Sequence, residues 1–161
     1  MLIRPAVSAD AAAIWAILEP VIRAGETYAL DRAMPKAAAL AYWFGADKEV
    51  FVATDESGAI LGTYYLRANQ AGGGAHVCNA GYMTGAAATG RGVARAMCQH
   101  SIDHAKARGF RAMQFNFVVS TNVRAIGLWQ SLGFEVVGRL PGAFAHPAEG
   151  FADALVMFRT L

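Results

Sequence analysis

The order of apolar and polar positions predicts helices and strands that alternate along the chain. Apolar residues recur at helical spacing from Ile14 to Ile22, so a helix is expected there. Ser8 stands where an N-terminal cap would lie, and Pro20 should kink or end the helix. A second helix is expected to open at Pro35, because proline is favoured in the first turn of a helix.

Strand-type runs dominate the middle of the chain and its C-terminal end. Val50–Thr54 and Ile60–Arg67 flank a turn that contains Gly58, which predicts an antiparallel hairpin. Two further helices are expected at about 91–108 and 122–132. The remaining expected strands span residues 2–4, 76–84, 111–119, 134–138 and 154–159.

The helix at about 91–108 connects two of these strands, 76–84 and 111–119. Strands joined in this way lie parallel with a right-handed crossover. The expected fold class is therefore α+β (a three-layer α/β arrangement), in which helices flank a mixed, largely antiparallel sheet with one central parallel β-α-β pair. A Pro/Gly loop is expected to separate the last two strands.

Length, composition and charge narrow the class of protein. The 161 residues, 55% of them hydrophobic, suit one packed domain over 1–161. Charged residues make up only 16%, which indicates either a surface buried in a homodimer or simply an alanine-rich composition. A net charge of +2 without a basic stripe argues against nucleic acid as a partner.

Membrane and secretory classes are not predicted either. No apolar run approaches the roughly 18 residues of a membrane span, and Asp10 interrupts the short apolar stretch near the N-terminus. Cys78 and Cys98 lack the spacing of a redox or metal motif. Two reduced, buried thiols in a cytoplasmic protein are the expected arrangement.

A glycine-rich turn between a strand and a helix contains the clearest candidate chemistry. Residues 84–95 read Thr-Gly-Ala-Ala-Ala-Thr-Gly-Arg-Gly-Val-Ala-Arg. Unpaired N–H groups and the helix dipole favour an anion at a helix start, so a diphosphate site is expected. Arg91 and Gly92 stand where a Walker A loop needs lysine and Ser/Thr, and Arg95 replaces the third glycine of a dinucleotide fingerprint.

This turn resembles the coenzyme A signature of GCN5-related N-acetyltransferases (GNAT), Arg/Gln-x-x-Gly-x-Gly/Ala, except that Thr89 occupies the first position. Residues 122–134, NVRAIGLWQSLGF, resemble the N-x-x-A-x-x-x-Y-x-x-x-G-F helix and turn of the same family. The strand sequences GTYYLR, HVCNAGYMT and QFNFVVSTN look closest to the branch that contains the fungal azetidine-2-carboxylate acetyltransferase. The resemblance extends over nearly the whole chain.

The resemblance implies that the parallel strands splay apart and that acetyl-CoA, as co-substrate, enters the gap, with no metal. Trp129 stands where many members have a tyrosine thought to protonate the leaving thiolate. We assign Trp129 to packing, so the general acid is another residue, water, or unnecessary. The residues expected to hold the cofactor are Tyr82, Met83 and Thr84 through their backbone, and Thr89, Gly90, Arg91, Gly92, Val93, Ala94, Arg95 and Asn122.

Polar residues near the expected gap are candidates for handling the acceptor. Asn79 and Asn116 interrupt apolar strands and should orient the acceptor, although a bulge or a structural hydrogen bond would also explain Asn116. Glu26 could take the proton of the incoming ammonium, or simply be an exposed glutamate. Tyr28 and Tyr64 could shape the acceptor pocket or only pack.

The four histidines are further candidates for site residues. His76 is a second candidate base, and His146 could help to close the acceptor side. His100 and His104 stand four residues apart but have no third ligand nearby, so a solvated helix face is expected there rather than a metal site.

The expected activity is transfer of the acetyl group of acetyl-CoA by direct attack of a small-molecule primary or secondary amine, such as an amino acid or imino-acid analogue. Two alternatives remain at this point. One is acetylation of a protein N-terminus or lysine, and the other is a non-catalytic module that binds acetyl-CoA.

Overall fold

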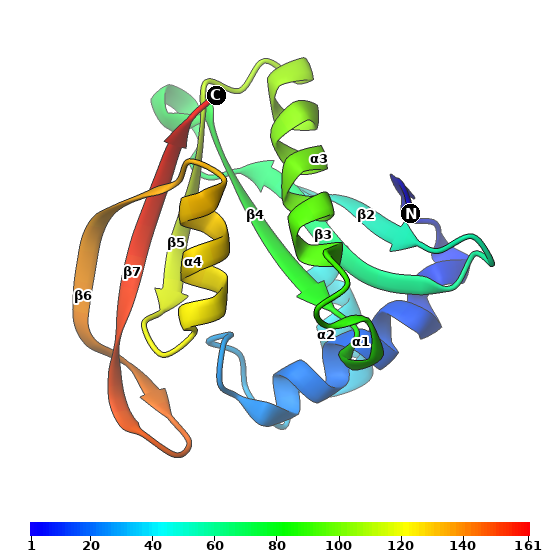
Figure 1. Cartoon of the computed structure of the whole chain (residues 1–161), viewed down its shortest axis with the longest axis horizontal. Helices are drawn as coiled ribbons and strands as arrows, with labels where there is room; N and C mark the ends of the chain where they lie inside the picture. Colours follow the sequence, from blue (N-terminus) through cyan, green and yellow to red (C-terminus); the bar gives the residue numbers. More distant parts are fainter.

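The computed structural model describes residues 1–161, which form one seven-stranded sheet with helices on both faces (Figure 1). The strand order is β1-β2-β3-β4-β5-β7-β6. The strands are β1 (Leu2–Pro5), β2 (Glu49–Thr54), β3 (Ile60–Ala68), β4 (Val77–Thr84), β5 (Ala112–Val119), β6 (Glu135–His146) and β7 (Gly150–Thr160). The helices are α1 (Ala11–Ala24), α2 (Lys36–Trp43), α3 (Val93–Ala107) and α4 (Val123–Ser131). The predicted α+β class is confirmed, and no helix is long and apolar enough to cross a membrane.

Two apolar cores lie on opposite faces of this sheet. On one face, α1 and α2 pack on alternate residues of the central strands, among them Tyr65 and Met83. On the other face, α3 and α4 pack on the residues between them, such as Tyr64 and Leu66. This alternation follows from the strand geometry, because successive side chains point to opposite faces.

The parallel pair at the centre of the sheet separates soon after it begins. β4 and β5 are in register only at Val77 with Ala112 and at Cys78 with Met113. Further along, β5 pairs with β7 and has a register irregularity between Phe115 and Val118. Figure 1 shows the two strands diverging toward their C-terminal ends. The splay that the family resemblance implied is therefore present.

The first helix does not end at Pro20, which was one of the two predicted outcomes. α1 continues through Pro20 to Ala24 and ends at Gly25, whose φ of 66° is left-handed. Ile22, beyond the proline, is buried in the same core as Ile14. The burial of this apolar stripe on both sides of Pro20 outweighs the one hydrogen bond that proline cannot donate.

The predicted Pro/Gly loop near the C-terminus is also wrong. Pro141 and Gly142 lie inside β6, which with β7 forms a long hairpin whose turn comes after His146. A register shift between Leu140 and Phe144 accommodates both residues. β6 is an edge strand, where a proline breaks no ladder hydrogen bond.

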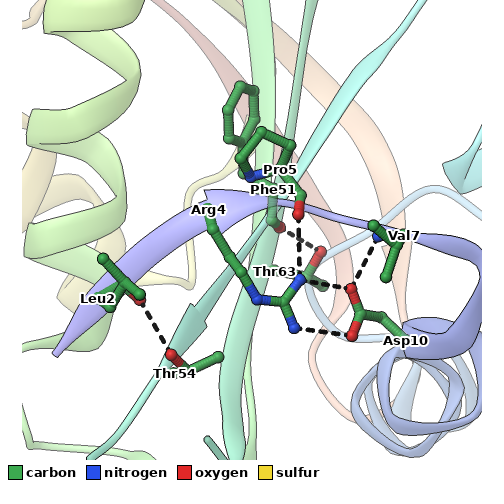
Figure 2. Close-up of polar contacts among 8 residues, drawn as sticks. All are labelled: Leu2, Arg4, Pro5, Val7, Asp10, Phe51, Thr54 and Thr63. Carbon is green, nitrogen blue, oxygen red and sulfur yellow. Dashed lines mark hydrogen bonds and ion pairs between the residues drawn. The ribbon is translucent and has the colours of Figure 1, made fainter.

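The N-terminus is fastened by Asp10 rather than by the predicted Ser8 cap. The Asp10 carboxylate accepts the Val7 N–H at 2.8 Å and both terminal nitrogens of Arg4 at 2.8 and 2.9 Å (Figure 2). These hydrogen bonds, above all those from Arg4, lower the pKa of Asp10. The bidentate pair ties β1 to the start of α1.

We expect Asp10→Asn to lower the free energy of unfolding at pH 7 by about 1 kcal/mol, because it removes charge-assisted hydrogen bonds. Since the folded-state pKa is depressed, this stability is present above the unfolded pKa of about 3.9 and is lost as pH falls through the folded value. Urea unfolding at pH 7 and pH 3 measures both effects. Glu56→Gln, at an exposed turn residue, is the control. If the wild type and the Asp10→Asn variant differed by the same free energy of unfolding at both pH values, the role assigned to the Asp10 carboxylate would be contradicted.

Candidate active site

A cavity occupies the gap between β4 and β5. Its volume is about 840 Å³, and 17 of its 26 lining residues are hydrophobic. Small-molecule sites typically have volumes of about 300–1,000 Å³ and apolar walls. β3, β4, β5, α4 and the chain between α1 and α2 all contribute to the wall.

The backbone of β4 presents to this cavity polar groups that β5 does not pair. Val77 accepts from the Asn69 N–H and Gly85 donates to the Leu61 carbonyl, so the odd-numbered positions bond to β3. In an antiparallel pair, the residues between them direct their N–H and C=O groups the other way. The N–H and C=O of Ala80, Tyr82 and Thr84 therefore face the gap, where β5 no longer pairs.

Tyr28 uses one of these carbonyls. Its hydroxyl donates to the Tyr82 carbonyl at 2.9 Å, and its ring lines the cavity. Burial, with a smaller contribution from Tyr42, raises the pKa of Tyr28, so the phenol stays protonated and keeps donating. By the alternation along β4, the Tyr82 N–H is left as a donor to a ligand. The Tyr82 side chain turns to the α3 face, where its hydroxyl bonds Ser101 at 2.7 Å.

The glycine-rich turn lies at one end of the cavity, to which Thr89 and Ala94 contribute. Gly90 and Gly92 have φ values of 82° and 77°, which side chains rarely adopt, and a Cβ at either would meet open space. The first helical hydrogen bond of α3 runs from the Ala96 N–H to the Gly92 carbonyl. The N–H groups of residues 92–95 consequently have no backbone partner.

The two arginines predicted beside this turn are directed elsewhere in the structure. Arg91 lies over a separate hollow next to Asp55 and Glu56. Arg95 donates to Ser131 Oγ at 2.8 Å and so links α3 to α4. A different cation, Arg124 on α4, lines the main cavity.

The start and body of α4 also form cavity wall. Asn122 caps the helix, because its Oδ1 accepts the Ala125 N–H at 3.3 Å, and it lines the cavity. Trp129 is nearly buried and packs against Tyr82 and Phe115, with ring centroids 5.1 and 5.3 Å apart. Its assignment to packing agrees with these contacts.

Both asparagines singled out from the sequence line the cavity. Asn79 donates to the Gln114 carbonyl at 2.9 Å and so bridges β4 and β5 just past their last pair. Asn116 lies at the irregularity of β5, donates to Asn69 Oδ1 at 2.7 Å and accepts from the Gln114 amide at 2.8 Å. The bulge and structural hydrogen bond that were the alternative for Asn116 are thus present beside its place in the cavity.

Two acceptor-side predictions do not fit the geometry. Glu26 is exposed and outside the cavity wall, although its neighbours Thr27 and Tyr28 belong to it. Tyr64 is fully buried on the α3 face, where its hydroxyl bonds His100 Nδ1 at 2.6 Å. Side chains alternate along β3, so it is Tyr65 that lines the cavity.

The histidines are also placed differently from expectation. His76 is exposed ahead of β4, and His146 Nδ1 accepts two backbone N–H groups of the β6–β7 turn at 3.2 Å. His100 and His104 do not form a solvated face, because both rings pack edge-on against Phe51. No cluster of His, Cys, Asp or Glu suited to a metal is present.

The cavity residues that the sequence did not indicate include Tyr65, Arg67 and Arg124. Arg67 follows Tyr65 by two positions on β3 and therefore shares its face of the sheet. Arg124 follows the predicted Asn122 by two positions. Alternation along the strand was a signal for Tyr65 and Arg67, but spacing gave none for Arg124, because residues two positions apart on a helix do not share a face.

Comparison with known proteins agrees with this geometry. The sequence profile of the "Acetyltransferase (GNAT) family" matches residues 15–134. A GCN5-related N-acetyltransferase structure from Kribbella flavida is 46% identical, with a TM-score of 0.95 over 99% of this chain and 97% of that one. The N-acetyltransferase aca1 of Schizosaccharomyces pombe is 28% identical over 84% of this chain and 72% of its own length. The structure of yncA from Salmonella typhimurium with acetyl-CoA is 25% identical, with a TM-score of 0.87 over 100% of this chain and 94% of that one.

The splayed strands, the open helix start and the profile match define an acyltransferase. The chain belongs to the acetyltransferase (GNAT) family. The family and the acetyl-CoA-bound relative also confirm acetyl-CoA as the predicted co-substrate.

Proposed function

We propose that this chain transfers the acetyl group of acetyl-CoA to a small-molecule primary or secondary amine, an amino acid or imino-acid analogue. The observation that carries the proposal is the cavity of about 840 Å³ between the diverging strands, which includes two neutral amides, Asn79 and Asn116. A concave, largely apolar site within this size range, which the acceptor would share with the arm of acetyl-CoA, suits a small acceptor. We also propose an acceptor like that of the fungal azetidine-2-carboxylate branch, which the strand sequences support.

In the proposed complex, the diphosphate of acetyl-CoA accepts hydrogen bonds from the N–H groups of residues 92–95, which have no backbone partner. The pantetheine arm follows β4 through Met83 and Thr84, and Asn122 lies beside it. The thioester carbonyl accepts the Tyr82 N–H, which stabilises the negative charge that develops on that oxygen during attack.

The neutral amine attacks the acetyl carbon, a C–N bond forms, the C–S bond breaks, and coenzyme A leaves as a thiolate. No Asp, Glu or His lines the cavity, so water takes the ammonium proton before attack and protonates the thiolate afterwards. A thiolate is a tolerable leaving group because thiols have pKa values of about 8.5. Alignment of amine and thioester provides most of the rate enhancement, at best about 7–11 kcal/mol.

Mass spectrometry of the protein with acetyl-CoA, a panel of small amines and a panel of peptides tests this function. We expect acetylation of amino or imino acids and none of the peptides. Acetylated peptides would identify a protein N-terminal or lysine acetyltransferase. Retained acetyl-CoA binding without transfer to any amine or peptide would identify a binding module.

Replacing Asn116 with alanine distinguishes an effect on acceptor binding from an effect on cofactor binding. We expect the acceptor KM to rise about tenfold, as for the loss of one or two neutral hydrogen bonds, while the Kd of acetyl-CoA stays unchanged. Steady-state kinetics and a separate cofactor titration measure the two. Gln130→Ala, at an exposed amide outside the cavity, is the control. A rise in the acetyl-CoA Kd alone would place Asn116 with the cofactor.

We further propose one N-acetyltransferase domain over residues 1–161 that forms a homodimer in the cytoplasm. The single continuous sheet supports the domain, and the two free, buried cysteines support the compartment. The exposed apolar residues of β6 and β7, with Phe151 82% exposed, support an interface there. Sedimentation of the wild type should give a dimer, and a monomer at all concentrations would contradict it.

A further inference from the structure

Arg67 places an unpaired donor at the wall of the cavity. It lies on β3 opposite Asn79 of β4, and both residues line the cavity. Its Nη1 donates to Asp47 Oδ2 at 3.0 Å. Its Nε is buried and has no hydrogen-bond partner, which is true of no other buried side-chain nitrogen or oxygen in the molecule.

The charges around Arg67 favour an anion. Among the 26 residues that line the cavity, only Arg67 and Arg124 are charged; Arg67 forms an ion pair with Asp47, which lies outside the cavity wall. Lys48, next to this end of the cavity, lies over the rings of Tyr42 and Tyr65 at 3.7 and 4.6 Å. Asp47 already accepts from the outer nitrogen of Arg67, so it leaves Nε without a partner.

The wall beside Arg67 is shaped by Tyr65. A Cβ on Gly81 would lie 2.7 Å from the Tyr65 ring, so the ring rests directly on the Gly81 backbone. Tyr65 and Arg67 share one face of β3, and Asn79 shares it through its pairing with Arg67. A donor, an amide and an aromatic wall therefore converge on the same part of the cavity.

We propose that Arg67 binds the carboxylate of the acceptor, so that the substrate class is an amine that also has a carboxylate. This proposal rests on the proposed acetyltransferase function. Guanidinium groups bind carboxylates with two parallel N–H···O bonds, and Nε with a terminal nitrogen forms such a fork. Nε has no accessible surface without a ligand, so the guanidinium has to turn toward the cavity for a carboxylate oxygen to satisfy this unpaired donor. Asn79 and Asn116 then orient the amine toward the thioester.

Paired acceptors that differ only in the carboxylate test the proposal. The probes are L-proline, L-azetidine-2-carboxylate and L-methionine, each compared with its carboxamide. We expect wild-type kcat/KM to be at least about thirtyfold higher for the acids, since hydrogen bonds to charged groups are the stronger ones. Arg67→Met should abolish this preference through the acceptor KM and leave the acetyl-CoA KM unchanged. Arg67→Lys should restore part of it, because the charge remains without the fork.

Arg111→Met, at an exposed arginine outside the cavity, is the matched control and should keep the preference. Thermal unfolding of each variant shows that it is folded. Equal use of acids and amides by the wild type would overturn the role of Arg67 and leave the acetyltransferase intact. If no amine is acetylated, calorimetric titration of the coenzyme A-loaded protein with N-acetylproline and N-acetylprolinamide decides: tighter binding of the acid that Arg67→Met abolishes supports the proposal, and equal binding overturns it.

Discussion

Gly92→Asp is expected to raise the Kd of acetyl-CoA by about thirtyfold. The aspartate would bring a carboxylate to the helix start where the diphosphate binds, and like charges a few ångströms apart near a surface repel by about 2–4 kcal/mol before salt screening. A net cost of about 2 kcal/mol corresponds to the expected change. Gly92 has a φ of 77°, and a Cβ added there meets no atom within 4 Å.

Gly92→Asn is the matched control for this variant, because asparagine has the same shape without the charge. Both substitutions impose the same left-handed backbone, which asparagine and aspartate tolerate better than other side chains. Calorimetric titration with acetyl-CoA at low and high salt measures the difference between them. An Asp variant that binds as tightly as the Asn variant would show that no diphosphate lies at this turn.

Trp43→Ala is expected to lower the free energy of unfolding by about 3–5 kcal/mol, as for other large aromatic side chains removed from a core. Trp43 is fully buried, its Nε1 donates to Thr63 Oγ1 at 3.0 Å, and its ring lies edge-on to Tyr65 with centroids 4.9 Å apart. The void left by the Trp43 side chain would also let Tyr65 and Tyr28 shift. Both pack on Trp43 and line the active-site cavity. We therefore expect the acceptor KM to rise as well.

Trp43→Phe keeps most of the volume and loses only the hydrogen bond to Thr63, so it should cost less than half as much. Urea unfolding of the three proteins gives the free energies, and steady-state kinetics at a temperature where all are folded gives the KM values. A Trp43→Ala variant with unchanged stability would contradict the placement of this core under the acceptor side.

The sequence was sufficient for the elements whose turns and connections have local signals. The hairpin of β2 and β3 contains Gly58 with a φ of 86°, and the helix between β4 and β5 requires a parallel crossover. The predictions at Pro20 and Pro141 were wrong because the hydrogen bond that a proline cannot donate is a local cost. The contacts that outweigh this cost are made by residues distant in sequence. Neither the packing of Ile22 nor the position of β6 at the sheet edge can be read from neighbouring residues.

The candidate site was predictable where it depends on backbone and only partly where it depends on side chains. β3 is buried on both faces, so its apolar pattern does not reveal which residues face the cavity. A shift of one position exchanges Tyr64, which bonds His100, for Tyr65, which lines the cavity. The same ambiguity hid Arg67. The prediction for Glu26 was wrong for another reason: the sequence of a loop has no periodicity that shows which side chains point into a cavity.

A structure of the protein crystallised with acetyl-CoA tests the central claim most directly. We predict that the diphosphate contacts the backbone N–H groups of residues 92–95 and that the thioester carbonyl lies within hydrogen-bond distance of the Tyr82 N–H, between β4 and β5. A cofactor bound outside this gap, or one whose thioester points away from Asn79 and Asn116, would contradict the account.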